Sequence, residues 1–87
     1  MARYFMQLRD GTDQLLDPDG IETADLDGLK KKVLIAVRDL ISEDVKVGGV
    51  IDLRFRIDAE DQGGVIVYTL AFAEALNIIP DAKALSA

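Results

Sequence analysis

The chain has 87 residues, a formal net charge of −6 and neither cysteine nor histidine. This length allows one domain with a small core, and the lack of cysteine excludes disulfides, thiolate chemistry and cysteine-ligated metals. Without histidine, acid–base catalysis near neutral pH would require a carboxylate with a shifted pKa. The negative charge disfavours non-specific binding to nucleic acids and to acidic membranes.

No segment near the start is apolar for long enough to form a signal peptide or a membrane span. We therefore expect a cytoplasmic protein without membrane contact. A single domain is expected over residues 1–79, followed by a flexible tail over residues 80–87, because Pro80 ends the last helical segment.

Residues 3–9 predict a first strand, because their side chains alternate between two faces. The two faces carry Tyr4, Met6 and Leu8 on one side and Arg3, Phe5, Gln7 and Arg9 on the other. A turn around Gly11 follows, and Leu15 and Leu16 open a short second strand. The turn residues 17–20 limit this second strand, which we expect to lie at an edge of the sheet.

A long helix is predicted next. Asp25 is a suitable N-cap, and apolar residues recur at helical spacing over residues 26–41. We expect the helix to run to about Lys46 and the glycine pair 48–49 to end it. The lysines at 30–32 fall on the polar side of this periodicity, which is typical of a solvated helix face.

Residues 51–58 alternate strictly between apolar and charged side chains, which predicts a third strand with one buried and one wet face. After a hairpin loop at 60–64, residues 65–73 are apolar at almost every position, as in a strand buried on both faces. We therefore expect the strand at 65–73 to be central and the strand at 51–58 to lie at an edge. A short helical turn should follow within residues 72–78.

This order of elements predicts a two-layer α+β fold: a four-stranded sheet (β-β-α-β-β) with one long helix packed on one face and a short C-terminal helical turn. If the two most apolar strands are central, the spatial order of the strands is second, first, fourth, third.

Several segments resemble a family of small alpha-proteobacterial proteins of unknown function that is common in rhizobia. The most specific is the opening Arg3-Tyr-Phe-x-x-Leu-Arg-Asp-Gly11. Further matching residues are Asp19, Gly20, Ile21, Glu22, Asp25, Leu26, Leu70, Phe72, Glu74, Ala75 and Leu76. The resemblance covers residues 3–78 and implies kinship without an activity. Many members of that family carry histidine where this chain has Gln7, so a metal or acid–base role there does not extend to this chain.

Four aspartates surround the first hairpin: Asp10, Asp13, Asp17 and Asp19. Such carboxylates can hold a hard cation or shift one another's pKa. The segment around Asp17 matches only a fragment of a calcium loop, and turn chemistry accounts for these residues adequately. We expect no metal site, no cofactor and no catalytic group, and an acid-dependent hydrolase built on these aspartates is the least favoured function.

Four of the five arginines, Arg3, Arg9, Arg54 and Arg56, fall on predicted strands at positions that point away from the helix. Phe5 shares this face. The arginines could hold carboxylates, phosphates or stacked bases. Alternatively, they pair across strands with acids such as Asp52 and Asp58, which would leave little net positive potential.

A third interpretation is that a second subunit covers this sheet face, since one helix can shield only the other face. We therefore expect a non-enzymatic binding or protein-interaction module that self-associates through the sheet face. The alternative is a small-anion or nucleic-acid binding domain that uses the same arginines, with nucleic acid disfavoured by the net charge. The candidate interface residues are Arg3, Phe5, Arg9, Asp52, Arg54, Arg56 and Asp58, and the partner is a second copy or another protein.

Overall fold

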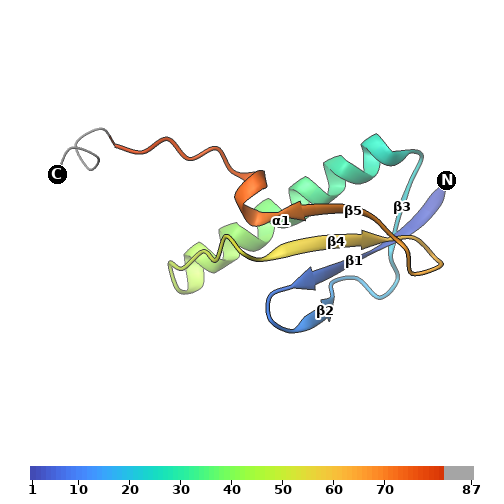
Figure 1. The fold of residues 1–87 in the computed structure, drawn as a ribbon, viewed down its shortest axis with the longest axis horizontal. Coiled ribbons are helices and arrows are strands. Elements are labelled where there is room, and N and C mark those ends of the chain that lie inside the picture. Colours follow the sequence, from blue (N-terminus) through green and yellow to red (C-terminus); the bar gives the residue numbers. More distant parts are fainter. Residues whose placement is uncertain (82–87) are drawn as a thin grey trace.

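The structure, a computed structural model, describes residues 1–81 of the chain. One antiparallel sheet forms a single layer, and a long helix lies across one of its faces (Figure 1). The strands are β1 (Ala2–Arg9), β2 (Asp13–Leu15), β3 (Ile21–Thr23), β4 (Arg56–Glu60) and β5 (Ile66–Ala71). The helix is α1 (Leu26–Val47), and a 3-10 turn, η1 (Phe72–Ala75), follows β5. The predicted α+β architecture is thus confirmed, while most of the tail predicted at 80–87 lies outside the described residues.

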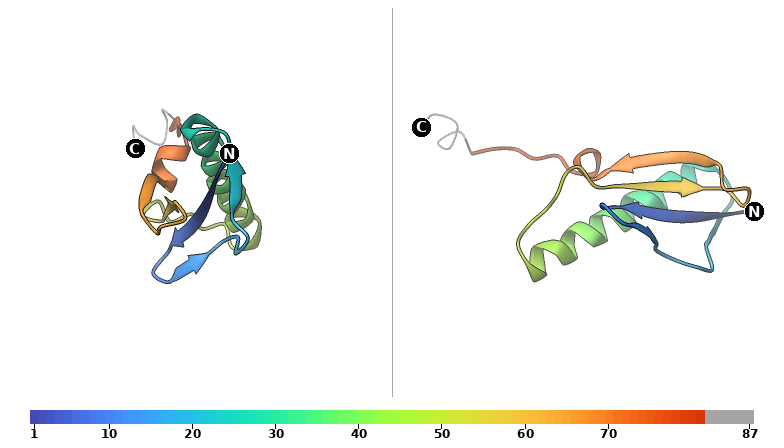
Figure 2. Two further views of the ribbon diagram at one scale, coloured as in Figure 1. Left: turned by 90° about the vertical axis from the view of Figure 1, so that its right-hand side faces the viewer. Right: turned by 60° about the horizontal axis from the view of Figure 1, so that its bottom comes forward.

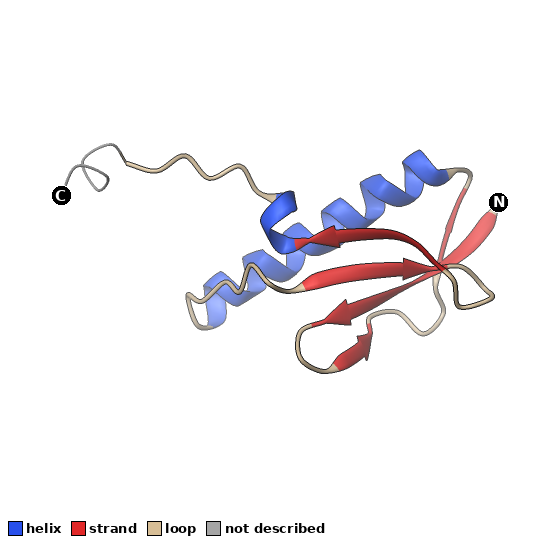
Figure 3. Cartoon of the chain, in the orientation of Figure 1, coloured by secondary structure: helices blue, strands red, loops and turns tan. Residues whose placement is uncertain are grey.

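The sheet has five strands rather than the predicted four (Figure 3). β1 pairs with β4 and also with two short strands, β2 beside its C-terminal half and β3 beside its N-terminal half. The prediction missed β3 because three residues are too few to show an alternating pattern. Its pairing with β1 also fixes the chain where it enters α1.

The predicted positions of the last two strands were wrong. β4 lies between β1 and β5, and β5 forms the edge of the sheet. The apolar run that starts β5 is not buried on both faces, because Val65, Ile66 and Val67 are 60%, 49% and 39% exposed. The charged positions of β4 are accepted in the middle of the sheet because Arg9 of β1 pairs with Asp58 and Glu60, and Arg56 pairs with Asp58 within β4.

The strand predicted at 51–58 begins only at Arg56. The Asp52 carboxylate accepts a hydrogen bond from the Arg54 backbone N–H at 2.9 Å, and the Phe55 N–H donates to the Asp52 carbonyl at 3.3 Å. These two bonds close a turn, which removes residues 51–55 from the strand despite their alternating pattern.

The core lies between α1 and the sheet. Leu29, Val33, Val37 and Ile41 of α1 pack against side chains from alternate positions of the strands. These strand residues are Met6, Leu8, Ile57, Ala59 and Leu70. Phe72 and Ala75 of η1 complete the core, and Phe72 meets Phe55 edge to face with ring centroids 5.8 Å apart. The other sheet face therefore contributes little to the apolar core.

The boundaries of α1 agree closely with the prediction. Asp25 caps its start by accepting a hydrogen bond from the Gly28 N–H at 2.7 Å, and the Gly48 N–H bonds to carbonyls of the last turn. The lysines at 30–32 are exposed as expected, although Lys30 also lies 5.5 Å from the centroid of the Tyr68 ring. Within residues 1–81, no helix combines the length and apolarity that a membrane span requires.

Candidate functional site

The sheet face turned away from α1, here called the outer face, carries most of the predicted site residues. α1 lies against the opposite face (Figure 2). Cross-strand partners share a face, and the register places Arg9 opposite Arg56 and Gln7 opposite Asp58. Thr69 of β5 lies opposite Asp58 on the other side. The middle of the outer face is therefore polar and charged.

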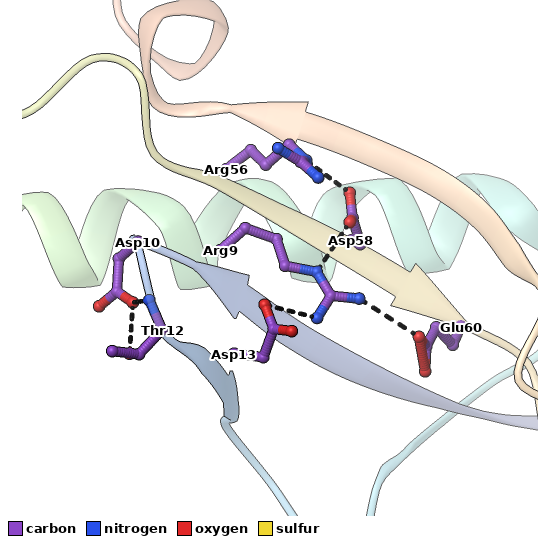
Figure 4. Close-up of polar contacts among 7 residues, drawn as sticks. All are labelled: Arg9, Asp10, Thr12, Asp13, Arg56, Asp58 and Glu60. Carbon is purple, nitrogen blue, oxygen red and sulfur yellow. Dashed lines mark hydrogen bonds and ion pairs between the residues drawn. The ribbon is translucent and has the colours of Figure 1, made fainter.

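Asp58 is at the centre of this face and is only 2% exposed. Its Oδ2 accepts from Arg9 Nε at 3.0 Å and its Oδ1 accepts from Arg56 Nε at 3.2 Å (Figure 4). Asp58 Oδ1 also accepts from Thr69 Oγ1 at 2.8 Å. These donors come from β1, β4 and β5, so one carboxylate connects three neighbouring strands. A buried carboxylate of this kind requires such partners, because its desolvation is costly.

Two opposing effects act on the pKa of Asp58. Burial by itself raises the pKa, because it disfavours the charged form of the carboxyl. The hydrogen bonds from Thr69, Arg9 and Arg56 together outweigh burial, so the pKa of Asp58 is lowered from its ordinary value. Asp58 is therefore a charged, structural group at neutral pH.

Arg9 is held by three carboxylates. In addition to Asp58, its Nη1 lies 3.1 Å from Asp13 Oδ1, and its Nη2 lies 3.6 Å from Glu60 Oε1. Figure 4 shows the guanidinium between these acids, which come from β2 and β4. Because all three of its nitrogens face acidic oxygens, Arg9 has little capacity left to bind an anion.

The other predicted site residues lie apart from this cluster. Arg54 and Asp52 precede β4 and form a two-point ion pair, with Nε–Oδ1 at 3.0 Å and Nη2–Oδ2 at 2.7 Å. The side-chain hydrogen bonds from Arg54, followed by the bond from its backbone N–H, lower the pKa of Asp52 to about 2. Arg3 pairs with Glu22 of β3. Each of the four arginines thus has an acidic partner, but only Arg3 and Arg9 pair across strands, whereas Arg54 and Arg56 pair with acids two residues away in the chain.

Phe5 lies in β1, four residues before Arg9, and is partly buried. A Cβ at Gly20 would lie 2.9 Å from Phe5 Cε1 and 2.9 Å from the Tyr4 carbonyl oxygen, so the β2–β3 connection lies close against this ring at Gly20. Gly20 also has φ of +75°, which other residues rarely adopt. Gly20 and the partial burial of Phe5 reduce the ring surface on which a base could stack.

An open concavity of about 690 Å³ lies on the outer face beside the Asp58 cluster. It is lined by Arg9, Asp10, Gly11, Asp13, Arg54, Phe55, Arg56, Asp58 and Ile66. The three arginines and three aspartates of this lining balance in charge. Arg56 is 49% exposed and uses Nε for Asp58, while its two terminal nitrogens make no hydrogen bond within residues 1–81. The concavity is therefore of mixed charge rather than a cationic site.

Asp13 and Glu60 are partners of Arg9 that the sequence interpretation did not assign to this face. Asp13 follows Arg9 by four residues across a tight turn, and this spacing could have indicated that the two side chains pair. Two of the remaining hairpin aspartates hold turns: Asp10 accepts from the Thr12 N–H and hydroxyl, and Asp17 accepts from the Asp19 N–H. In the part of the chain that the structure describes, no three acidic side chains are placed to hold a metal ion.

Comparison with known proteins gives one family match. The model of a family described as a domain of unknown function, DUF6894, matches residues 3–73. This range includes nearly the whole of β1 and every later strand, together with α1. None of the curated proteins and none of the solved structures matches the chain significantly. The chain therefore belongs to the DUF6894 family of domains of unknown function.

Proposed function

We propose that this chain is a cytoplasmic, non-enzymatic protein-interaction module that associates with a second copy through the outer face of its sheet. The bare outer face supports this proposal most directly. α1 covers one face, and no helix among the described residues covers the other. We also propose that the chain is related to small alpha-proteobacterial proteins, as its opening segment suggests.

The outer face has the mixture of groups that a symmetric contact uses. Leu15, opposite Gln7 in the register, and Ile66, opposite Glu60, are exposed apolar residues on either side of the charged centre. In a two-fold contact each copy presents the same patch, so the exposed Arg54 and Arg56 of one concavity can meet the exposed Asp13 of the other. A balanced concavity is self-complementary in this sense.

The acids that line the concavity support a binding role rather than catalysis. Asp58 is held by three donors, Asp13 faces Arg9, and Asp10 accepts two hydrogen bonds from Thr12. A general base must instead be free to take a proton from a substrate.

The test is the oligomeric state of a Leu15→Glu variant, measured by sedimentation velocity over a range of chain concentrations. We expect the wild-type chain to be a dimer and Leu15→Glu to weaken the dimer by at least about tenfold, or about 1.4 kcal/mol of association free energy. Ile35→Glu is the matched control, because Ile35 is an exposed apolar residue of α1. A monomeric wild type, or equal dimerisation of Leu15→Glu and wild type, would overturn the proposal.

A small anion is the second candidate ligand, and the free terminal nitrogens of Arg56 in the concavity favour it. Arg56 could bind one carboxylate or phosphate group in a two-point contact beside Phe55. Titration with inorganic phosphate at low salt, followed by NMR shifts of β4, tests this. Shifts that persist in Arg56→Gln would exclude Arg56 as the ligand.

A further inference from the structure

The edge of the sheet at β5 is open. β5 pairs with β4 on one side, and no other described strand pairs with it. Natural proteins usually protect such an edge with lysine, proline or inward-pointing charges. β5 contains none of these residues, since its sequence is Ile-Val-Tyr-Thr-Leu-Ala. An uncharged edge strand with exposed apolar side chains is a ready template for an added strand.

Residues 76–80, here called the arm, form an exposed segment that follows η1. Leu76 has extended backbone angles (φ −120°, ψ 145°), and Ile78 and Ile79 are 65% and 83% exposed. Within the described chain, the backbone of residues 76–80 makes no hydrogen bond. The arm is uncharged, with the sequence Leu-Asn-Ile-Ile-Pro, and it follows the residues that the family model matches.

The starting point of the arm is firmly fixed. The Ala75 carbonyl accepts from Arg38 Nε of α1 at 3.0 Å, the Phe72 N–H donates to the Phe55 carbonyl at 2.8 Å, and Ala75 is buried. From this anchored turn the arm continues in the direction of β5 and leaves the sheet (Figures 1 and 2). To reach the edge of its own β5, the arm would have to reverse its direction.

We propose that the arm of one copy adds as a strand to the open β5 edge of a second copy, in a reciprocal exchange. The lengths agree, since five residues of strand span about 16 Å and six span about 20 Å. Pro80 cannot donate a hydrogen bond, so it would end the added strand. Two chains that each carry a net charge of −6 repel one another, and this pairing joins them where neither segment is charged.

This contact does not use the centre of the outer face, so it can exist whether or not the outer face also self-associates. The test therefore uses the full-length chain carrying Leu15→Glu, in which an outer-face contact is removed. We expect this variant to retain a dimer in native mass spectrometry. Adding Ile78→Asp and Ile79→Asp should weaken that dimer by at least about tenfold. The matched control adds Ile35→Asp and Val47→Asp instead, which places the same two charges on exposed positions of α1.

Hydrogen exchange of the β5 amides gives a second, independent measurement. We expect the amides on the open edge of β5 to be protected in the Leu15→Glu dimer and to exchange faster once the arm carries the two aspartates. A monomeric Leu15→Glu chain, or a dimer that the arm substitutions leave unchanged, would overturn the arm exchange. Protection of the same amides in a monomer would also overturn it, because the arm would then fold onto its own sheet. If the wild type dimerised through the outer face alone, the proposed function would stand and only the arm exchange would be overturned.

Discussion

At the scale of single residues, Asp58 limits what the outer face can do. It is the one charged side chain among residues 1–81 that is almost fully buried. Arg9 and Arg56 are bound to it through their Nε atoms, so neither arginine is an unpaired cation, although the terminal nitrogens of Arg56 make no hydrogen bond within residues 1–81. A face that reads as cationic from its arginines is in fact nearly neutral, which is why we favour a protein partner over nucleic acid.

We expect Asp58→Asn to lower the free energy of unfolding by about 2 kcal/mol, because two guanidinium groups and the Thr69 hydroxyl lose a charged acceptor. The variant should also be less acid-sensitive. A carboxyl with a lowered pKa in the folded state stabilises the fold above its unfolded pKa of about 3.9 and loses this contribution as the pH falls through the folded value. Urea unfolding from neutral pH down to acid measures both effects.

The control for this prediction is Asp13→Asn, which changes an exposed partner of the same Arg9. Exposed ion pairs contribute little, so its loss should be clearly smaller than that of Asp58→Asn. Equal losses from the two variants would show that the buried position of Asp58 has no special importance. Some acid sensitivity should remain in Asp58→Asn, because the pKa of Asp52 is also lowered, to about 2.

At the scale of elements, the first turn of α1 depends on close contact with the strand that precedes it. A Cβ at Gly28 would lie 2.2 Å from the Thr23 hydroxyl oxygen, which is far inside van der Waals contact. Thr23 is buried at the end of β3, and its hydroxyl donates to the Asp25 carbonyl at 3.3 Å. The glycine therefore allows β3, the helix cap and α1 to come together.

We expect Gly28→Ala to destabilise the protein, although the same change in an ordinary exposed helix stabilises by about 1 kcal/mol. The expected cost is about 1 to 3 kcal/mol, the range for overpacking a well-filled site. Thermal unfolding followed by circular dichroism measures it. The double variant Thr23→Ala, Gly28→Ala should recover part of the loss, since the nearest remaining Thr23 atom would be its Cβ at 3.6 Å. A Gly28→Ala variant more stable than wild type would refute this explanation.

At the scale of the whole molecule, both proposals make stability depend on association. Anything that binds only the folded state raises the apparent stability by mass action. We therefore expect the Tm of the wild-type chain to rise with chain concentration. Differential scanning calorimetry over about a hundredfold range of concentration measures this dependence.

A variant that combines Leu15→Glu with Ile78→Asp and Ile79→Asp is the comparison for this measurement. It disables both proposed contacts through exposed side chains, so its Tm should be independent of concentration. A wild-type Tm that stays constant over the same range would mean that neither contact forms under these conditions.

The sequence by itself determined the features that depend on neighbouring residues. α1 could be predicted almost to its ends, because Asp25, the apolar spacing and Gly48 act within a few turns of the chain. The two faces of β1 followed from alternation, which also indicated that Arg9, Arg56 and Asp58 share a side of the sheet. The α+β class followed from these elements.

Only the tertiary structure decided the order of β4 and β5 and which residues come together around Asp58. Asp58 can lie in the middle of the sheet because Arg9 and Thr69, 49 and 11 residues away in sequence, supply its hydrogen bonds. The apolar β5 can lie at the edge because nothing in its own sequence specifies how many neighbours it will have. Charge neutralisation and strand pairing join residues that are distant in the chain, so local patterns do not contain them.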